Sequence, residues 1–279
     1  MNIEHARSFL AVADTGSFVA AAERLHVTQS TISARIRTLE DTLGTTLFVR
    51  NKAGAVPTPS GVRFRAHAIK MVRAFERARR EIRLPDNISY QIAIGARFGL
   101  WDDKIIDWIA RQRRERSDLS VHAEIAFEPE LMQGLIDGHL DIGIMYTPQR
   151  RPNLEQIPFK TEHLKLISSC HDESEISDSY IHIDWAPEFD EQISSSLPAI
   201  SSPRISVNVG WLGLEFLKVV GGSAYLPERL AEVQLASGKF HIVKDAPEFD
   251  IRSWLVIRDD RDKKIVDPMV ESLIMIQSY

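Results

Sequence analysis

Two short helical patterns separated by a three-residue turn near the N-terminus restrict the fold of this chain more than any other feature. Ser17 is placed to cap a first helix, 18–25, and Thr28 can cap a second one that runs to Leu43, with Gly44 in the usual C-terminal position. Two helices joined by so tight a turn are typical of a helix-turn-helix.

The second of these helices has an apolar stripe and an opposite polar face. Ile32, Ile36, Leu39 and Leu43 recur at helical spacing and fall on one stripe of the helix. The other face carries short polar and basic side chains near the helix N-terminus, an arrangement that enters a DNA major groove and reaches base edges. The DNA contacts expected on this helix are Gln29, Ser30, Thr31, Ser33, Arg35 and Arg37.

A helix before this pair and a hairpin after it complete the expected N-terminal unit. Apolar residues at helical spacing predict a helix over 2–13. Two short strands over 46–57 flank a turn and indicate a hairpin wing tipped with positive charge, in which Arg50 and Lys52 would meet phosphate or the minor groove. We therefore predict an all-α winged helix-turn-helix DNA-binding domain over residues 1–58.

A long helix is predicted next, from Pro59 to about Leu84, with Thr58 supplying a capping hydroxyl before the proline. Its apolar residues are spaced alternately four and three apart, which keeps one seam facing a partner helix, so residues 59–86 are predicted to be a linker and dimerisation helix. The seam consists of Phe64, Ala68, Met71, Phe75, Ala78 and Ile82. A basic run, Arg73, Arg77, Arg79, Arg80 and Arg83, is expected on the solvated face.

The charge of the chain is divided unevenly. Residues 1–84 hold 14 Lys/Arg and 7 Asp/Glu, whereas the rest of the chain holds 20 and 32, so a net charge of +7 is followed by one of −12. A basic N-terminal part followed by an acidic remainder is expected if only the first domain contacts phosphates.

From residue 87 onward, short apolar runs alternate with helical stretches, which is typical of α/β architecture. We expect strands near 91–95, 120–126, 140–146, 164–169, 180–184, 203–208, 223–226, 239–244 and 251–257, and helices near 101–116, 129–138, 187–196, 210–220 and 263–277. The pattern predicts a two-lobed ligand-sensing α/β domain over 87–279, resembling periplasmic binding proteins, with a crossover near 147–158. Its ligand is expected in the cleft between the lobes.

Dense motifs in residues 1–65 match the pattern of one family. They are Phe9-Leu10-Ala11-Val12-Ala13, Gly16-Ser17-Phe18, Ala20-Ala21-Ala22-Glu23-Arg24-Leu25, Val27-Thr28-Gln29-Ser30, Ile32-Ser33, Ile36-Arg37, Leu39-Glu40, Leu43-Gly44, Leu47-Phe48, Arg50 and Thr58-Pro59-Ser60-Gly61. Sparser landmarks follow within 131–144 and 219–227. On these motifs the chain resembles the LysR-type transcriptional regulators over nearly its full length.

The resemblance implies a sequence-specific DNA-binding regulator rather than an enzyme. It implies dimers through the long helix, usually dimers of dimers, and a small-molecule effector in the interlobe cleft that alters DNA contacts; RNA polymerase is an optional further partner. By position, Gln29, Ser30, Ser33 and Arg35 correspond to recognition-helix contacts and Arg50 to the wing. Many relatives place Ser or Thr after the first effector strand to hold a ligand carboxylate, whereas this chain has Ala96-Arg97-Phe98 there.

Loop positions after the predicted strands supply the candidate effector contacts. They are Arg97, Phe98, Trp101, Phe127, Glu128, Tyr146, Asp184, Trp185 and Trp211. Arg97 favours an anionic ligand group, whereas the tryptophans with Glu128 or Asp184 favour a cation, and both alternatives stay open. Packing between sheet and helix is the commoner fate of large aromatic residues, and an internal salt bridge is the commoner one for Arg97.

Other kinds of site are not indicated. No pair among the nine histidines has HxxxH spacing and the single cysteine, Cys170, excludes a two-cysteine switch, so neither a metal, nor a cofactor, nor a catalytic residue is expected. The absence of a signal peptide and of a long apolar run leads us to expect a cytoplasmic protein that does not enter a membrane.

Two rival functions remain open at this stage. One is a ligand-independent, nucleoid-type DNA binder, for which a basic N-terminal part suffices. The other is an enzyme with an appended DNA-binding domain, although GxSxG, Walker and GxGxxG motifs are missing from the sequence.

Overall fold

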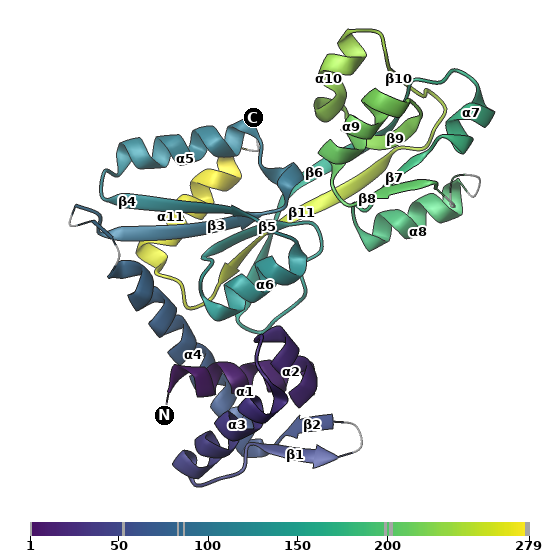
Figure 1. The fold of residues 1–279 in the computed structure, drawn as a ribbon. Helices are drawn as coiled ribbons and strands as arrows, with labels where there is room; N and C mark the ends of the chain where they lie inside the picture. Colours follow the sequence, from purple (N-terminus) through teal and green to yellow (C-terminus); the bar gives the residue numbers. More distant parts are fainter. Residues whose placement is uncertain are drawn as a thin grey trace. The chain divides into compact units, whose positions relative to one another are not determined.

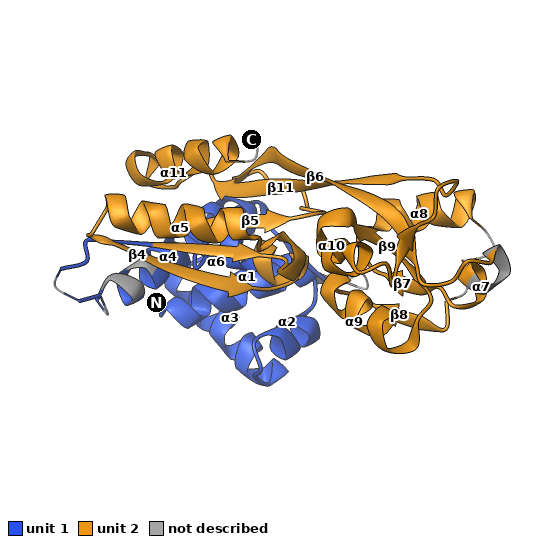
Figure 2. Ribbon diagram, turned by 90° about the horizontal axis from the view of Figure 1, so that it is seen from above, with its two compact units in different colours: residues 1–91, 133–140 blue, residues 92–132, 141–279 orange. Residues whose placement is uncertain are grey.

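The computed structural model of the protein describes residues 2–51, 54–82, 84–85, 87–197, 200 and 203–276. The chain divides into two units, residues 1–91 with 133–140 and residues 92–132 with 141–279 (Figure 2). No helix among the described residues combines the length and the apolar character needed to cross a bilayer.

The first unit begins with three helices whose ends carry capping residues. They are α1 (Ile3–Thr15), α2 (Phe18–Arg24) and α3 (Gln29–Leu43) (Figure 1). The side chain of Ser17 accepts a hydrogen bond from the Ala20 N–H, and that of Thr28 accepts one from the Thr31 N–H. Gly16 and Gly44 close α1 and α3 with φ of 65°, the left-handed conformation that glycine adopts without strain.

The wing is a hairpin of strands β1 (Phe48–Asn51) and β2 (Gly54–Pro57), held at both ends. One carboxylate oxygen of Glu40 in α3 accepts hydrogen bonds from the N–H groups of Leu47 (2.6 Å) and Phe48 (3.2 Å). At the other end the Ala55 N–H donates to the Gly16 carbonyl (2.8 Å), and a Cβ on Gly54 would lie 2.4 Å from that oxygen. The wing is therefore fixed to the helices it follows.

Replacing Glu40 by Ala should destabilise the first unit by about 1–2 kcal/mol, because two backbone donors lose their acceptor. All 5 tryptophans lie between Trp101 and Trp254, in the second unit, so urea unfolding followed by far-UV circular dichroism should shift while the tryptophan fluorescence transition stays in place. Asp41→Ala, at the exposed neighbouring position, is the control. Equal effects of the two substitutions would contradict the assigned role of Glu40.

Helix α4 (Pro59–Glu81) packs its first half into the core of the first unit. Phe64, Ala68 and Met71 join a cluster built around Phe9, whose ring centre lies 5.0 Å from that of Phe64. Ala68 is thus buried and Phe64 and Met71 are partly buried within the first unit, and their contact with a partner helix stays a prediction. The later seam residues remain exposed: Phe75, Ala78 and Ile82.

One expectation for the basic run of α4 also fails. Arg73 is buried, with 6% of its surface exposed, and its Nε donates to the carbonyl oxygen of Ile136 at 2.9 Å, in the 133–140 segment of the same unit. A solvated face was expected here because five arginines recur over residues 73–83. Arg79 is exposed as predicted, and Arg83 lies outside the described residues.

The second unit contains two lobes. The first lobe is built from β3 (Tyr90–Ala96), the 3-10 turn η1 (Phe98–Leu100), α5 (Asp103–Glu115), β4 (Leu119–Ile125), α6 (Glu128–Asp137), β5 (Ile142–Met145) and α11 (Lys263–Met275). Residues 90–91 of β3 and 133–137 of α6 fall in the first unit. Strand β3 pairs in parallel with β5. Helices α5 and α11 lie side by side (Figures 1 and 2), and the indole N–H of Trp108 donates to the Ser272 hydroxyl at 2.8 Å.

The second lobe surrounds the far ends of two long strands. It consists of α7 (Glu173–Asp178), β7 (Ile181–Ile183), α8 (Pro187–Ser196), β8 (Ile205–Val207), α9 (Gly210–Val220), β9 (Ser223–Pro227), α10 (Glu228–Ala236) and β10 (His241–Ile242). The long strands β6 (Leu154–Ser168) and β11 (Phe249–Arg258) pair antiparallel and run from one lobe into the other (Figure 1). The main sheet has the order β10-β6-β11-β5-β3-β4, and β9 also pairs with β6.

Three elements differ from the sequence prediction. The last part of the expected crossover over 147–158 is strand, because β6 begins at Leu154 and continues through Pro158. Proline removes a ladder donor, which argues against a strand in the sequence, but here it lies beside a bulge opposite Ser253 where pairing is irregular. Helices α7 and α10 were not expected, because each is a short pattern that lies between two predicted strands.

Candidate DNA-binding surface and interlobe cleft

The polar face predicted on α3 is exposed at its N-terminus. Gln29, Ser30 and Arg37 are exposed, whereas Thr31 and Ser33 are half-buried. The hydroxyl of Thr28 lies 2.8 Å from that of Ser30 and 2.9 Å from that of Thr31. Local hydrogen bonds therefore hold the hydroxyl groups, and Gln29 and Arg37 present long polar side chains to solvent.

Arg35, also expected on the DNA-contacting face, is engaged within the first unit. Its guanidinium donates to the Ser8 hydroxyl at 3.3 Å and lies 3.4 Å from the Glu4 carboxylate, both in α1. The side chain thus ties α3 to α1. In the wing, Arg50 belongs to β1, and Lys52 lies outside the described residues.

The structure brings four of the predicted effector residues together around Arg97, directly after β3. The Arg97 guanidinium donates to the Glu128 carboxylate at 2.8 Å and lies 4.7 Å from the centre of the Phe127 ring. Its other terminal nitrogen donates to the carbonyl oxygens of Asn208 (3.0 Å) and Asp184 (3.4 Å), which belong to the second lobe. Arg97 therefore makes an internal salt bridge and also connects the two lobes.

Tyr146, at the end of the β5 segment, is buried beside this cluster. Its backbone N–H donates to the Glu128 carboxylate at 3.3 Å, but its hydroxyl has no hydrogen-bond partner within the described parts of the chain. Burial raises the pKa of this phenol far above its ordinary value. A buried hydroxyl without a partner is costly, so Tyr146 is a strong candidate for contact with a bound molecule.

The tryptophans separate into three environments. Trp185 is buried in the second lobe and donates its indole N–H to the Tyr225 carbonyl at 2.9 Å, so its role is packing. Trp211 is exposed and contacts Phe98 of the first lobe, with ring centres 5.9 Å apart. Trp101 donates to the Glu124 carbonyl at 3.3 Å, away from the Arg97 cluster. The predicted set is therefore not a single aromatic cage.

A second charged cluster was missed by the sequence analysis. Glu162 in β6, with 3% of its side chain exposed, accepts two hydrogen bonds from Arg229, at 2.6 and 3.2 Å, and lies 3.3 Å from the Lys160 ammonium. Lys160 also pairs with Asp102 at 3.1 Å, and Arg229 donates to the Gly99 carbonyl at 2.8 Å. Arg229 of the second lobe thereby contacts the first lobe, just as Arg97 of the first lobe contacts the second.

Cavities open on the crossing strands of this unit. One of about 520 Å³ is lined by Tyr146, Arg150, Arg151, Glu188 and Trp254 among others, and one of about 380 Å³ shares Tyr146, Glu188 and Trp254 with it. A third, of about 790 Å³, lies against Trp101, Lys160 and Arg229. All three have the size of small-molecule sites.

Comparisons with known proteins agree with this architecture. The family model for the bacterial regulatory helix-turn-helix protein, lysR family, matches residues 3–62, and that for the LysR substrate binding domain matches residues 86–172. The HTH-type transcriptional regulator HdfR of Yersinia enterocolitica is 30% identical over 241 residues, 82% of each chain. The HdfR of Yersinia pestis is 29% identical over 240 residues, again 82% of each chain.

Solved structures share the fold at lower identity. Full-length BenM is 19% identical with a TM-score of 0.55, and the match covers 100% of this chain and 97% of BenM. ArgP from Mycobacterium tuberculosis is 21% identical with a TM-score of 0.54, covering 98% and 96%. These likenesses confirm the expected fold, a winged helix-turn-helix followed by a two-lobed α/β domain. Together with the family models, they establish that this chain belongs to the LysR family of transcriptional regulators.

Proposed function

We propose that this regulator binds a specific operator sequence by inserting the N-terminal part of α3 into the major groove. The exposed side chains of Gln29 and Ser30 carry this proposal, because an amide and a hydroxyl can each pair with a base edge, whereas the exposed guanidinium of Arg37, further along the helix, can pair with phosphate. The chain acts in the cytoplasm on double-stranded DNA and catalyses no reaction.

The regulator works as a dimer, or as a dimer of dimers, through α4. Phe75 has 45% of its surface exposed and Ile82 has 84%, and Ala78 lies exposed between them on the same helix. Covering these side chains by a second α4 would remove apolar surface from water. This dimer contact is shorter than the seam predicted from the sequence, because the first half of that seam packs against the core of the first unit.

A small-molecule effector binds beside Tyr146 and changes the DNA contacts of the first unit. The unpartnered phenol supplies a hydrogen bond. Arg97 is paired with Glu128, but Arg150, Arg151 and Glu188 line the same cavity as Tyr146 and offer charged groups of both signs. A thermal-shift screen of the full chain should therefore favour polar compounds over apolar ones of the same size.

Selection from a random pool of duplex DNA tests the DNA-binding function. A single enriched motif is expected, with clear preference over scrambled duplexes at physiological salt. Enrichment without a motif would favour the nucleoid-type alternative. Chemical turnover of a compound selected in the thermal-shift screen would favour the enzyme alternative.

Tyr146→Phe should weaken binding of a compound selected in that screen about two- to tenfold, since one hydrogen bond contributes about 0.5–1.5 kcal/mol. The melting temperature without the compound should not fall, because the lost hydroxyl has no partner among the described residues. Tyr180→Phe is a matched control: it also removes a buried, unpartnered hydroxyl, but from a residue that lines none of the three cavities. Equal weakening by both variants would contradict the placement of the effector.

A further inference from the structure

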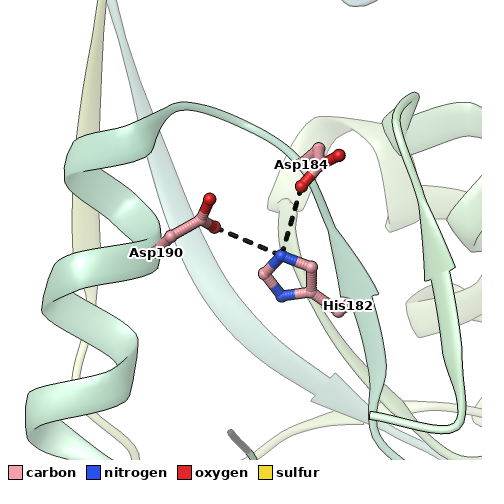
Figure 3. Close-up of side chains that lie close together, drawn as sticks. All are labelled: His182, Asp184 and Asp190. Carbon is pink, nitrogen blue, oxygen red and sulfur yellow. Dashed lines mark ion pairs between the residues drawn. The ribbon is translucent and has the colours of Figure 1, made fainter. Parts of the chain in front are cut away.

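One histidine and two aspartates converge in the second lobe (Figure 3). His182 belongs to β7, Asp184 directly follows that strand, and Asp190 belongs to α8. The His182 Nε2 atom lies 3.4 Å from an Asp184 carboxylate oxygen and 3.2 Å from one of Asp190. One ligand atom from each residue lies within 4.8 Å of the other two.

An ordinary ion pair accounts poorly for this group. An imidazole Nε2 carries at most one hydrogen and can donate it in one direction, yet two carboxylates face it at similar distances. The Asp190 oxygen nearest the ring is buried and has no hydrogen-bond partner within the described residues. At least one of the two carboxylates therefore faces the imidazole nitrogen without a hydrogen to accept from it.

The separations fit a shared cation. Imidazole nitrogen and carboxylate oxygen bind Zn²⁺ and similar ions at about 2.0–2.2 Å, which places neighbouring ligand atoms about 3.0–3.5 Å apart. Both measured His–Asp distances lie in this interval. We propose that His182, Asp184 and Asp190 form a binding site for a divalent transition-metal ion.

The surrounding chain holds these ligands in place. The backbone N–H of Asp184 donates to the Val207 carbonyl at 2.8 Å, and the His182 ring stacks on Phe189 with 18° between their planes. Asp184 is exposed and the other two ligands are half-buried, so water can complete the coordination from the solvent side. An imidazole with two carboxylates suits Zn²⁺, Co²⁺ or Mn²⁺, whereas Mg²⁺ prefers oxygen ligands alone.

The site goes beyond DNA recognition and does not depend on it. It adjoins the interlobe contact, because the Asp184 carbonyl oxygen accepts a hydrogen bond from Arg97. Metal binding is measured on the protein alone, so its failure leaves the DNA-binding proposal standing, and loss of DNA binding leaves the metal site standing.

The test is a titration of the chelator-treated full chain with Co²⁺, followed by its visible absorption, and with Zn²⁺, followed by calorimetry. We expect one ion per chain and no competition from equimolar Mg²⁺. The double variant Asp184→Asn, Asp190→Asn keeps the side-chain size and should lower affinity about 100-fold or more, while far-UV circular dichroism stays unchanged. His182→Gln should have the same effect on affinity.

Two controls separate this site from adventitious binding. Asp250→Asn alters an exposed His163–Asp250 pair with atoms 2.6 Å apart in the same lobe, and His171→Gln breaks the stacked His171–His241 pair. Both controls should retain the full affinity. Absence of Co²⁺ binding by the unaltered protein, or equal loss in the controls and in the site variants, would overturn the proposal.

Discussion

Gln29→Ala is expected to lower affinity for the selected operator about 5- to 150-fold and to leave binding to scrambled DNA almost unchanged. The reason is that a side-chain amide that pairs with a base edge contributes about 1–3 kcal/mol of discrimination. Gln29 is exposed at the first position of α3, and the Thr28 cap keeps that turn ordered without it. Fluorescence anisotropy with both duplexes at several salt concentrations measures the two quantities.

Arg37→Ala is the informative comparison, because Arg37 is exposed two turns further along α3. If Arg37 contacts phosphate, its loss should weaken binding to both duplexes alike and reduce the salt slope by about one. Gln29→Ala should therefore weaken binding to the operator alone, whereas Arg37→Ala should weaken binding to both duplexes. Equal weakening of operator and scrambled DNA by Gln29→Ala would exclude base readout by this residue.

Glu162→Gln is expected to destabilise the second unit by about 3 kcal/mol. The substitution preserves shape but removes the charge that lies between Arg229 and Lys160, and breaking a buried ion pair from one side costs about 3–5 kcal/mol. The lower end applies because Arg229 is partly exposed and keeps the Gly99 carbonyl as an acceptor. Urea unfolding followed by tryptophan fluorescence reports on this unit alone, since it contains all 5 tryptophans.

Glu232→Gln provides the matched control. Glu232 in α10 lines the cavity that Lys160 and Arg229 also line, but it is exposed, so the same chemical change should alter stability by less than about 0.5 kcal/mol. A Glu162→Gln protein as stable as the control would show that the cluster contributes nothing net to the fold.

The helix-turn-helix could be predicted closely because its determinants are local. Ser17, Thr28 and the two closing glycines act within one turn of their own helix, so the helix ends can be predicted from these residues without knowledge of the rest of the chain. The wing followed from a similarly short pattern. Its attachment to α3 did not, since Glu40 reaches backbone groups seven and eight residues away.

The interlobe contacts depend on pairs far apart in sequence. Arg97 could be singled out as a loop residue after a strand, but its partner Asn208 lies 111 residues away and contributes only a carbonyl oxygen. Glu162 was missed because it lies between the expected crossover over 147–158 and the strand expected near 164–169, where no element was predicted. Arg229, 67 residues further on, buries it. The same limit applies to His182 and Asp190, whose spacing matches no metal-binding pattern.

The paired strands β6 and β11 make the second lobe an insertion into the first. The chain leaves the first lobe along β6 near Glu162 and re-enters it along β11 at Ile251, and these two residues are partners in the ladder. A short turn joining them would close the hairpin and leave every strand neighbour of β3, β4 and β5 in place. Second lobes with different binding preferences could thus be exchanged between relatives at this one pair of strands, without changing the strand order of the first lobe.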